Sequence, residues 1–453
     1  MAVLKSFNPV NGEPVGEVPI TAVDAIPALV QRSRVAQREW RNLPIDERAR
    51  CIAAAGPEIV ERAAELGALL TAEMGKPLPA ATGEVRSCGR GLDQEVAEIV
   101  AALAPEVLED GRTSTTLYRD PYGVCAAITP WNFPISMPHW LVVPALIAGN
   151  TVLLKPSEET PLIADQWARI LMKHLPPDVL QIVHGDGDQG RALVASEVDL
   201  IGFTGSRAAG AHILSAAGRD LKRVLLELGG KDPLIVLEDA DVAVAAKFAA
   251  GNSFRNTGQV CVSTERIYVH DSIHDAFVSA LVEEAGKLVV GDGMVDSTDL
   301  GPMIHARQKS HVVAQVQAAC VAGAQIRFGE TALDGNFLGP IVLVDVDSSM
   351  DIMVEETFGP VAAVQRFHST AEAIELANDT VYGLGAVVLG GPTADDVARR
   401  LDAGMVGINR GVGGASGSPW VGAKQSGYGF HSGVHGHRQF AQVRIISRRI
   451  ERS

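Results

Sequence analysis

A cysteine and a glutamate in this sequence each stand on a glycine-containing turn that would expose a reactive side chain. Cys261 ends the run Asn256-Thr257-Gly258-Gln259-Val260-Cys261, and Glu227 opens the upstream run Glu227-Leu228-Gly229-Gly230-Lys231. A thiolate can attack a carbonyl carbon, and a carboxylate can activate the water that then releases the acyl group. The pair therefore predicts an enzyme that works through a covalent intermediate.

The cysteines as a group are scattered and odd in number. They are Cys51, Cys88, Cys125, Cys261 and Cys320, and none belongs to a Cys-x-x-Cys pair. This pattern suits a reducing cytosol, so we expect a cytoplasmic protein without a disulfide framework or a thiolate zinc site. All of them except Cys261 are interpreted as inert thiols.

The histidines His431, His435 and His437 lie close together in a glycine-rich stretch, which raises the question of a metal site. No carboxylate or cysteine follows them at ligand spacing. We therefore predict a solvated loop at an interface and no bound metal.

Length, charge and composition limit the possible partners. The chain has 453 residues, a net charge of −15 and 47% hydrophobic residues. This length exceeds what one hydrophobic core serves, so two or more domains are expected. The acidic balance argues against a nucleic-acid or anionic-membrane partner. The apolar stretch 141–154 is interrupted by Pro144, Gly149 and Asn150, and residues 1–9 lack a signal-peptide core, so we expect neither a membrane span nor secretion.

Short apolar runs alternate with helical patterns, and these elements must position the two reactive side chains. Amphipathic helices are predicted from Ile26 to Leu70. Strands are predicted at 125–128, 151–154, 180–183, 200–203 and 224–226, and then at 234–237, 266–269 and 385–389, with a helix at 276–288 before the last. Strands buried on both faces and separated by helices predict parallel α/β sheets, whose strand ends form a nucleotide crevice. We place the domain boundary near Gly229-Gly230, so that Glu227 and Cys261 face a cleft.

Two further segments belong to neither series of strands. Residues 113–118 and 442–446 alternate in polarity as exposed strands do. Unpaired strand edges of this kind often join subunits, so we expect a homo-oligomer.

Additional motifs follow one another along the chain. They are Pro130-Trp131-Asn132-Phe133-Pro134, Lys155-Pro156-Ser157-Glu158, Phe203-Thr204-Gly205-Ser206, Glu227-Leu228-Gly229-Gly230-Lys231, Gly258-Gln259-Val260-Cys261, Glu356-Thr357-Phe358-Gly359-Pro360 and Lys424-Gln425-Ser426-Gly427. In this order they resemble the motifs of the NAD(P)-dependent aldehyde dehydrogenase superfamily. Each motif alone is weak, but the set is specific and the resemblance runs over nearly the whole chain.

The resemblance implies an α/β fold with a Rossmann-like cofactor-binding domain, an α/β catalytic domain and a small β arm for oligomerisation. We assign residues 1–99 and 122–228 to the NAD-binding domain and 229–415 to the catalytic domain. Residues 100–121 and 430–453 are assigned to oligomerisation segments. Because the family forms dimers or dimers of dimers, a homodimer or homotetramer is expected.

The resemblance also gives the reactive residues their roles. Cys261 would attack an aldehyde, and the Asn132 side chain with the backbone N–H of Cys261 would stabilise the oxyanion of the thiohemiacetal. Loss of hydride to the nicotinamide leaves a thioester, which water activated by Glu227 hydrolyses to the acid. Lys155 is included among the catalytic residues. Glu227 argues against a CoA-acylating relative, and the intact reactive set argues against a non-catalytic member of the fold.

The predicted cofactor site lacks the usual Gly-x-Gly-x-x-Gly fingerprint. The turn Gly202 to Ser206 replaces it, where backbone N–H groups, Ser206 and the Trp131 indole could hold a pyrophosphate. Glu158 would bind ribose hydroxyls and repel a 2′-phosphate, so NAD is favoured and NADP remains possible. The predicted cofactor-binding residues are Ile128, Trp131, Lys155, Ser157, Glu158, Gly185, Gly187, Phe203, Thr204, Gly205, Ser206, Leu228, Gly229, Glu356 and Phe358.

The substrate tunnel is expected to be apolar and aromatic. Its predicted residues are Phe133, Trp140, Val260, Val262 and Trp420. Family members that oxidise short semialdehydes commonly have an arginine where this chain has Trp140. Desolvating an anionic tail without a paired cation is costly, so an uncharged aliphatic or aromatic aldehyde is predicted. Arg410 could still supply a cation, which leaves a succinate-semialdehyde-type substrate open.

Overall fold

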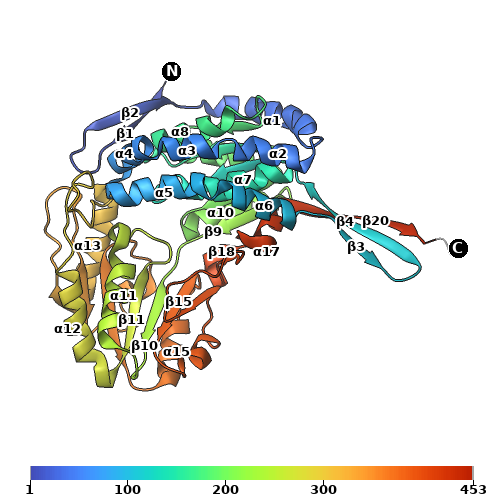
Figure 1. Ribbon diagram of the computed structural model, residues 1–453. Coiled ribbons are helices and arrows are strands. Elements are labelled where there is room, and N and C mark those ends of the chain that lie inside the picture. The colour runs from blue at the N-terminus through green and yellow to red at the C-terminus, as the bar shows by residue number, and fades with distance from the viewer. Residues whose placement is uncertain (1, 451–453) are drawn as a thin grey trace.

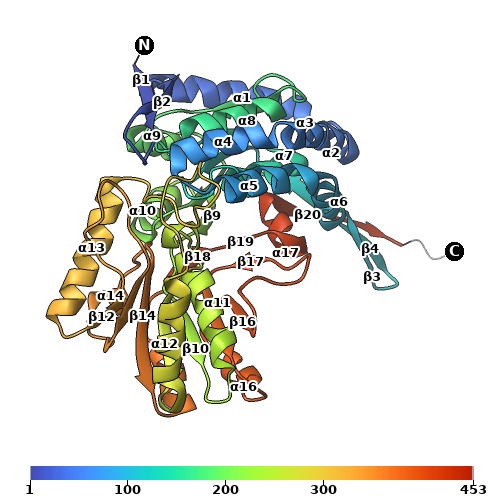
Figure 2. The ribbon, with the colours of Figure 1, turned by 60° about the vertical axis from the view of Figure 1, so that its left-hand side comes forward.

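The computed structural model describes residues 2–450, so Met1 and the last residues of the predicted segment 430–453 lie outside the described part. Two large sheets with their helices form the body, and a small sheet projects from it as an arm (Figures 1 and 2). Along residues 2–450 no helix is both long and apolar enough to cross a bilayer. The α/β architecture predicted from the sequence is confirmed.

The first sheet has six strands in the order β18-β9-β8-β5-β6-β7, and only β18 is antiparallel to its neighbour. The parallel strands are β5 (Val124–Ile128), β6 (Thr151–Lys155), β7 (Leu180–Ile182), β8 (Leu200–Thr204) and β9 (Arg223–Glu227). Every residue of β5 and β6 is buried, which fits strands with helices on both faces. The five strand runs predicted before Gly229 are therefore confirmed, with small shifts at their ends.

Helices of the N-terminal half cover this sheet, and a short hairpin of β1 (Val3–Phe7) and β2 (Pro14–Pro19) precedes them. The helical pattern from Ile26 to Leu70 becomes α1 to α4. The helices are α1 (Ile26–Trp40), α2 (Ile45–Ala53), α3 (Gly56–Glu61), α4 (Ala63–Met74), α5 (Leu78–Arg90), α6 (Leu92–Ala102), α7 (Ser136–Ala148), α8 (Pro161–Met172), α9 (Gly187–Ala195) and α10 (Arg207–Gly218).

The second sheet has seven strands in the order β12-β13-β14-β11-β10-β15-β16, with β12 antiparallel at one edge. Its strands are β10 (Asp232–Val236), β11 (Thr264–His270), β12 (Gln325–Phe328), β13 (Ile341–Val344), β14 (Val361–Phe367), β15 (Gly385–Leu389) and β16 (Met405–Ile408). Its helices are α11 (Val242–Phe254), α12 (His274–Ala285), α13 (Ala306–Val321), α14 (Asp351–Val354), α15 (Thr370–Asn378) and α16 (Ala394–Ala398). Separate apolar clusters fill its two faces, so this sheet has a core of its own.

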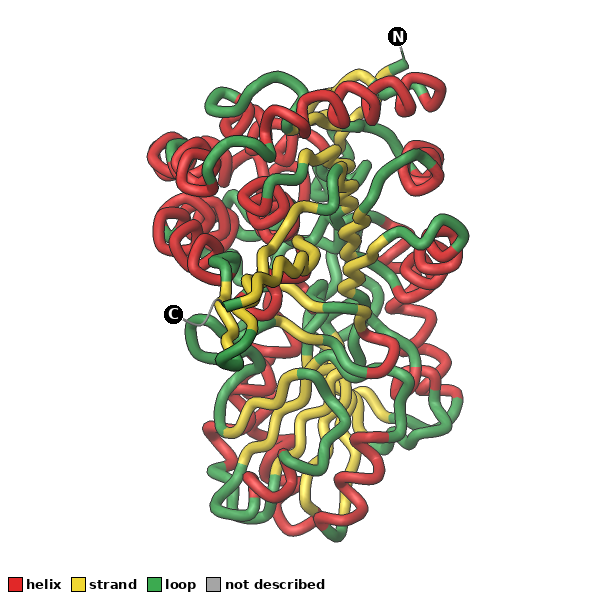
Figure 3. Tube along the Cα trace, turned by 90° about the vertical axis from the view of Figure 1, so that its right-hand side faces the viewer, coloured by secondary structure: helices red, strands yellow, loops and turns green. Residues whose placement is uncertain are grey.

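The arm is a three-stranded antiparallel sheet that points toward the viewer in Figure 3. It consists of β3 (Glu106–Glu109), β4 (Thr113–Pro121) and β20 (Ala441–Arg449), in the order β20-β4-β3. The prediction of an unpaired edge at 113–118 was wrong, because β4 lies between β20 and β3. An alternating pattern identifies an exposed strand but does not identify its neighbours.

The chain returns to the first sheet before it enters β20. β17 (Trp420–Val421) pairs with β19 (Phe430–His431), while β18 (Gly427–Tyr428) places Gly427 opposite Glu227. The short helix α17 (Gly433–His437) follows. His431 and His437 are each only 4% exposed, so the prediction of a solvated histidine loop was wrong. The Gly-rich composition suggested a loop, but packing against neighbouring rings and α6 buries two of the three histidines.

Candidate active site

The turn before Cys261 has an unusual backbone. Asn256, Thr257 and Gly258 all have positive φ angles, of 53°, 57° and 69°. A left-handed conformation is costly for a β-branched threonine, so the surroundings must enforce it. The Thr257 hydroxyl donates to the carbonyl oxygen of Gly301 at 2.8 Å. A Cβ at position 258 would lie 2.0 Å from the carbonyl oxygen of Gly359, so only glycine fits there and the turn holds Cys261 in place.

Asn132 lies against the same turn. Its side-chain amide donates to the carbonyl oxygen of Gln259 at 3.1 Å, which fixes the amide beside the nucleophile loop. The backbone carbonyl oxygen of Asn132 accepts a hydrogen bond from Lys76 Nζ at 2.9 Å. The amide thus bonds a backbone carbonyl two residues before Cys261, which is consistent with the predicted role of Asn132 as an oxyanion donor.

A buried ion pair that the sequence analysis missed supports Asn132. Lys76 Nζ lies 2.5 Å from Glu84 Oε2, and both side chains are almost fully buried. Glu84 Oε1 accepts from the backbone N–H groups of Ile135 and Ser136 at the start of α7. Nothing near Lys76 or Glu84 in the sequence signals this role, because the partners meet only through long-range packing.

Glu227 ends β9 and is 6% exposed. Its Oε1 is buried without a hydrogen-bond partner. Desolvation raises the pKa of Glu227 well above its ordinary value, and the Trp420 indole opposes this only in part. A carboxylate of raised pKa is a stronger base toward water than an exposed one.

Cys261 is half-buried and unpaired. Desolvation is the largest cause that raises the pKa of the Cys261 thiol. The charges of Glu227, Asp232 and Glu356 raise this pKa further, while the charge of Arg255 lowers it. Acidic side chains therefore disfavour the Cys261 thiolate, and Arg255 is the cation that favours it. Arg255 directly precedes the cysteine turn and was missed, although its place in the sequence could have drawn attention to it. The other cysteines are also unpaired, as predicted.

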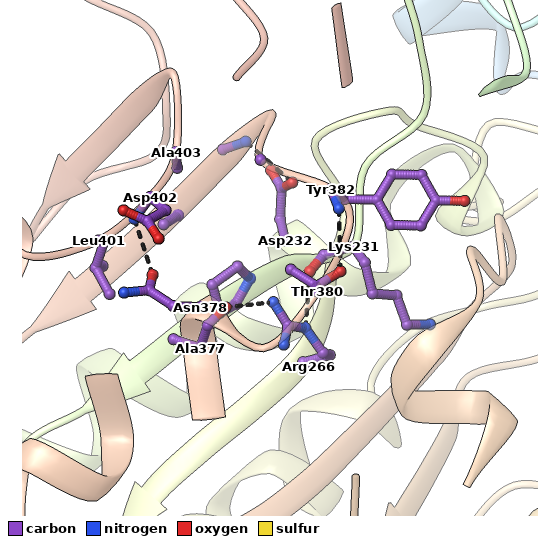
Figure 4. Close-up of a pocket in the computed structure, with 14 residues that line it drawn as sticks. Lys231, Asp232, Arg266, Ala377, Asn378, Thr380, Tyr382, Leu401, Asp402 and Ala403 are labelled. Carbon is purple, nitrogen blue, oxygen red and sulfur yellow. Dashed lines mark hydrogen bonds between the residues drawn. The ribbon is translucent and has the colours of Figure 1, made fainter. Parts of the chain in front are cut away.

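Asp232 lies at the start of β10, next to a small buried cavity of about 10 Å³ that Figure 4 shows with Lys231, Arg266 and Tyr382. This volume is roughly that of one water molecule. Asp232 Oδ1 accepts from Gly385 N at 3.0 Å, whereas Oδ2 is buried without a partner. Desolvation raises the pKa of Asp232 to about 8, so the group is protonated at neutral pH and adds little negative charge beside Cys261.

A second buried ion pair, Lys231 with Glu265, holds the loop that carries Glu356 and Phe358. Lys231 Nζ lies 2.6 Å from Glu265 Oε2. Glu265 accepts from the backbone N–H groups of Thr357 and Phe358, both at 2.8 Å. Phe358 has a positive φ of 50°, so these bonds stabilise a strained backbone. The geometry of this loop therefore depends on Lys231 and Glu265, whose pairing was not predicted from the sequence.

The predicted cofactor residues gather at the carboxyl ends of the strands in the first sheet. Ile128, Lys155 and Thr204 end β5, β6 and β8, and the strand order reverses between β5 and β8, where α/β sheets bind nucleotides. Ser206 caps α10 by accepting from Ala209 N at 3.3 Å, and the amides of that helix start face the same edge. Gly205 N donates to the backbone carbonyl oxygen of Glu227, which links this turn to the end of β9.

The remaining cofactor residues lie around this crevice. Trp131 packs edge-on against Phe358, with ring centroids 5.6 Å apart. A Cβ at Gly229 would lie 2.5 Å from the Glu356 carboxylate, so backbone and acid approach closely there. Lys155 Nζ lies 3.2 Å from Glu158 Oε2. Ser157 and Leu228 are buried, and they follow the ends of β6 and β9 in the sequence. Gly185 and Gly187 follow β7, the outermost strand at this edge of the sheet. Helix-start amides and ribose-binding carboxylates in one crevice fit a dinucleotide.

The predicted tunnel residues fall into two groups. Val260 and Val262 are buried in one apolar cluster with Phe133, Cys261 and Trp420. Trp140 instead stacks on His431 at 5.2 Å and lies 6.1 Å from Trp420. His431 was not predicted to belong here. Desolvation lowers the pKa of His431 to about 3, so the ring that contacts both tryptophans is neutral.

Two further predictions concern positive charge in this region, one from the Arg410 side chain and one from a metal ion. Arg410 is exposed just after β16 and has no ion pair among residues 2–450. Within the same described range, no group of histidines, cysteines and carboxylates is arranged to hold a metal ion.

Comparisons with known proteins agree over the full chain. The sequence profile described as "Aldehyde dehydrogenase family" matches residues 2–446. The mitochondrial succinate-semialdehyde dehydrogenase of Arabidopsis thaliana is 37% identical over 98% of this chain and 85% of its own. A probable NADP-dependent succinate-semialdehyde dehydrogenase of Sinorhizobium fredii is 37% identical over 97% and 91%. A crystal structure of an aldehyde dehydrogenase from Brucella melitensis biovar abortus superposes with a TM-score of 0.96 at 34% identity, covering 100% of this chain and 95% of that one.

Proposed function

The chain belongs to the aldehyde dehydrogenase family, and from this premise we propose that it oxidises an aldehyde without an anionic group to its carboxylic acid, with NAD as the hydride acceptor. The reaction is supported by two observations: the Asn132 amide bonds the backbone just before Cys261, and the Glu227 carboxylate influences the pKa of the Cys261 thiol. The observation that carries the substrate class is the ring stack of Trp140, His431 and Trp420.

In the proposed reaction, the Cys261 thiolate attacks the aldehyde carbonyl and forms a thiohemiacetal. The Asn132 side-chain amide, which also donates to the carbonyl oxygen of Gln259, donates to the oxyanion together with the backbone N–H of Cys261, while Lys76 holds the Asn132 backbone carbonyl. Arg255 favours ionisation of the thiol, because its charge lowers the pKa of Cys261 against the effect of burial.

NAD, when bound, would supply the hydride acceptor, and loss of hydride from the thiohemiacetal carbon would leave Cys261 carrying the acyl group as a thioester. Glu227 then takes a proton from the attacking water, for which its raised pKa and its partnerless oxygen suit it. Release of the acid restores the thiol. Trp131 and Phe358 border the crevice on the side where the nicotinamide would lie.

We expect NAD to be preferred because of Glu158, although several similar proteins are named for NADP use. The Glu158 side chain is 41% exposed and can therefore meet a ribose while it pairs with Lys155. Exchange of Glu158 for serine removes the charge that would repel a 2′-phosphate. Glu158→Ser should shift the ratio of kcat/KM for NADP over NAD upward by about tenfold or more. Glu159→Ser, which changes the adjacent carboxylate, is the matched control, and an equal shift in both variants would contradict the assignment.

A second candidate, a semialdehyde dehydrogenase, is favoured by the names of the relatives and by Arg255 beside the nucleophile. The test is the kcat/KM for benzaldehyde, a medium-chain aldehyde and succinic semialdehyde with NAD, each with and without CoA. We expect the neutral aldehydes to be used best and CoA to be unnecessary. If succinic semialdehyde is used best and Arg255→Gln removes that preference, the second candidate replaces the first. Strict dependence on CoA would exclude hydrolysis.

The cytoplasmic location and the homo-oligomeric state stay predictions. The first rests on the unpaired cysteines. The second rests on the arm, where Val107 and Leu108 of β3 and Val443 and Ile445 of β20 are exposed apolar residues at the strand edges.

A further inference from the structure

A pocket of about 340 Å³ borders Trp140, beyond the apolar cluster that contains Cys261. Helix α6 contributes Gln94, Glu95 and Glu98 to its wall. The loop 414–418 and residues Ser432, Gly433 and His437 form the rest. The family resemblance does not account for these wall residues.

The charges on the wall have one sign. Glu95 and Glu98 are its only carboxylates, and neither lysine nor arginine lines it. Desolvation would raise the pKa of Glu95, but His139, which is hydrogen-bonded to this carboxylate, holds the pKa below its ordinary value, so Glu95 is ionised. Desolvation lowers the pKa of His437, so this ring adds no positive charge at neutral pH. The pocket is therefore anionic.

The polar groups of the wall have unused capacity to accept hydrogen bonds. Glu95 Oε2 lies 2.6 Å from His139 Nε2. Glu98 Oε1 accepts from Gln94 Nε2 at 3.0 Å and from Ser416 Oγ at 3.3 Å, and no lysine or arginine pairs with Glu98 in the described part of the chain. His437 is 4% exposed, and its Nδ1 is buried without a partner. This buried ring nitrogen is therefore free to form a hydrogen bond with a group in the pocket.

Aromatic contacts connect this pocket with the nucleophile. Trp140 lines the pocket and lies 6.1 Å from Trp420 between ring centroids. Trp420 in turn packs in the cluster that contains Phe133 and Cys261. A substrate whose carbonyl lies at Cys261 would thus extend along Trp420 and Trp140 toward the carboxylates. Tryptophan faces attract organic cations, and adjacent carboxylates strengthen that attraction.

We propose that this pocket binds a positively charged end of the substrate, an alkylammonium group on the chain of the aldehyde. The proposal rests on the proposed function, since it takes Cys261 as the point of attack. An anionic tail would meet two carboxylates and no cation, while a neutral tail would gain only the aromatic wall. Glu98 is a specificity-determining residue in this account, and Glu95 shares that role while it also orients His139.

The test compares (trimethylammonio)acetaldehyde with 3,3-dimethylbutanal, which have the same shape and differ in charge. For the full-length enzyme we expect kcat/KM to be about tenfold higher for the cation. Glu98→Gln should lower kcat/KM for the cation about five- to tenfold, mainly through KM, and leave the neutral aldehyde unchanged. Asp93→Asn, an exposed carboxylate change on the same helix, is the matched control.

The possible outcomes distinguish failure of the ammonium pocket from failure of the proposed dehydrogenase activity. Equal efficiency for both aldehydes, or equal losses for both in Glu98→Gln, would overturn the ammonium pocket and leave the dehydrogenase assignment intact. If neither these aldehydes nor the wider panel yields NADH, the proposed function fails as well. Charge reversal with Glu98→Lys should weaken use of the cation further and improve use of succinic semialdehyde; an unchanged order of substrates would count against the pocket.

Discussion

Cys261→Ser should lower steady-state NADH formation by about a thousandfold or more. A serine hydroxyl at the same position is far harder to ionise than a thiol, and burial together with the nearby Glu227 already opposes ionisation there. The hydroxyl therefore remains neutral and attacks the carbonyl poorly. No hydrolysis step follows, because no ester forms at a useful rate.

Loss of folding must be separated from loss of chemistry in this variant. The substitution is nearly isosteric in a half-buried position, so the thermal midpoint and the affinity for NAD should stay close to those of the parent protein. Cys320→Ser on α13 is the matched control, because that thiol is also half-buried and unpaired but lies in the core of the second sheet. Activity that survives in Cys261→Ser, or disappears in Cys320→Ser, would assign the nucleophile elsewhere.

The parts of the site that the sequence predicted are those set by strand ends. Glu227 and Thr204 end buried strands of one parallel sheet, and the carboxyl ends of parallel strands meet at one edge. Apolar runs between helical patterns define such strands well, so the crevice followed from local patterns. The turn at Gly258 was also readable, since glycine in a polar run signals a tight backbone.

The parts that the sequence could not predict depend on contacts between distant segments. β17, β18 and β19 are two residues long and carry no periodicity, yet β18 pairs with the strand that ends in Glu227. His431 appeared to be solvated because its neighbours are glycine and serine, but the rings of Trp140 and Trp420 bury it. The ion pairs of Lys76 with Glu84 and of Lys231 with Glu265 were likewise not predicted from the sequence. In each case the partner is chosen by tertiary packing.

These long-range pairs have a common position in the site. Each buried lysine neutralises a glutamate whose oxygens accept backbone N–H groups of a functional loop, the start of α7 in one case and the Thr357-Phe358 turn in the other. A buried carboxylate that bonds two amides fixes a loop firmly, provided that its charge is paired. The segments that carry Asn132 and Phe358 are thus each stabilised by a buried lysine–glutamate pair.

Glu227→Gln should uncouple the two halves of the reaction. Hydride transfer needs Cys261 and Asn132, so a first burst of NADH about equal to the enzyme concentration should remain. Hydrolysis of the thioester needs a base for water, and glutamine cannot accept that proton; steady-state turnover should therefore fall by about 10² to 10⁴. Rapid mixing followed by mass measurement of the intact chain would show the burst and the acyl adduct.

The replacement keeps the shape of the side chain, and Glu227 Oε1 has no partner to lose, so the fold should be retained. An added small thiol or hydroxylamine attacks a thioester without a general base and should restore turnover in Glu227→Gln, whereas it should add little to the parent enzyme. We expect no such rescue in Glu356→Gln, because this carboxylate accepts from Gly230 N at 3.1 Å and is predicted to bind the cofactor, which is needed before the thioester forms. Full activity of Glu227→Gln, or a stalled enzyme without an acyl adduct, would remove this carboxylate from the hydrolysis step. A burst that only an external nucleophile can release would instead identify Glu227 as the group that delivers water.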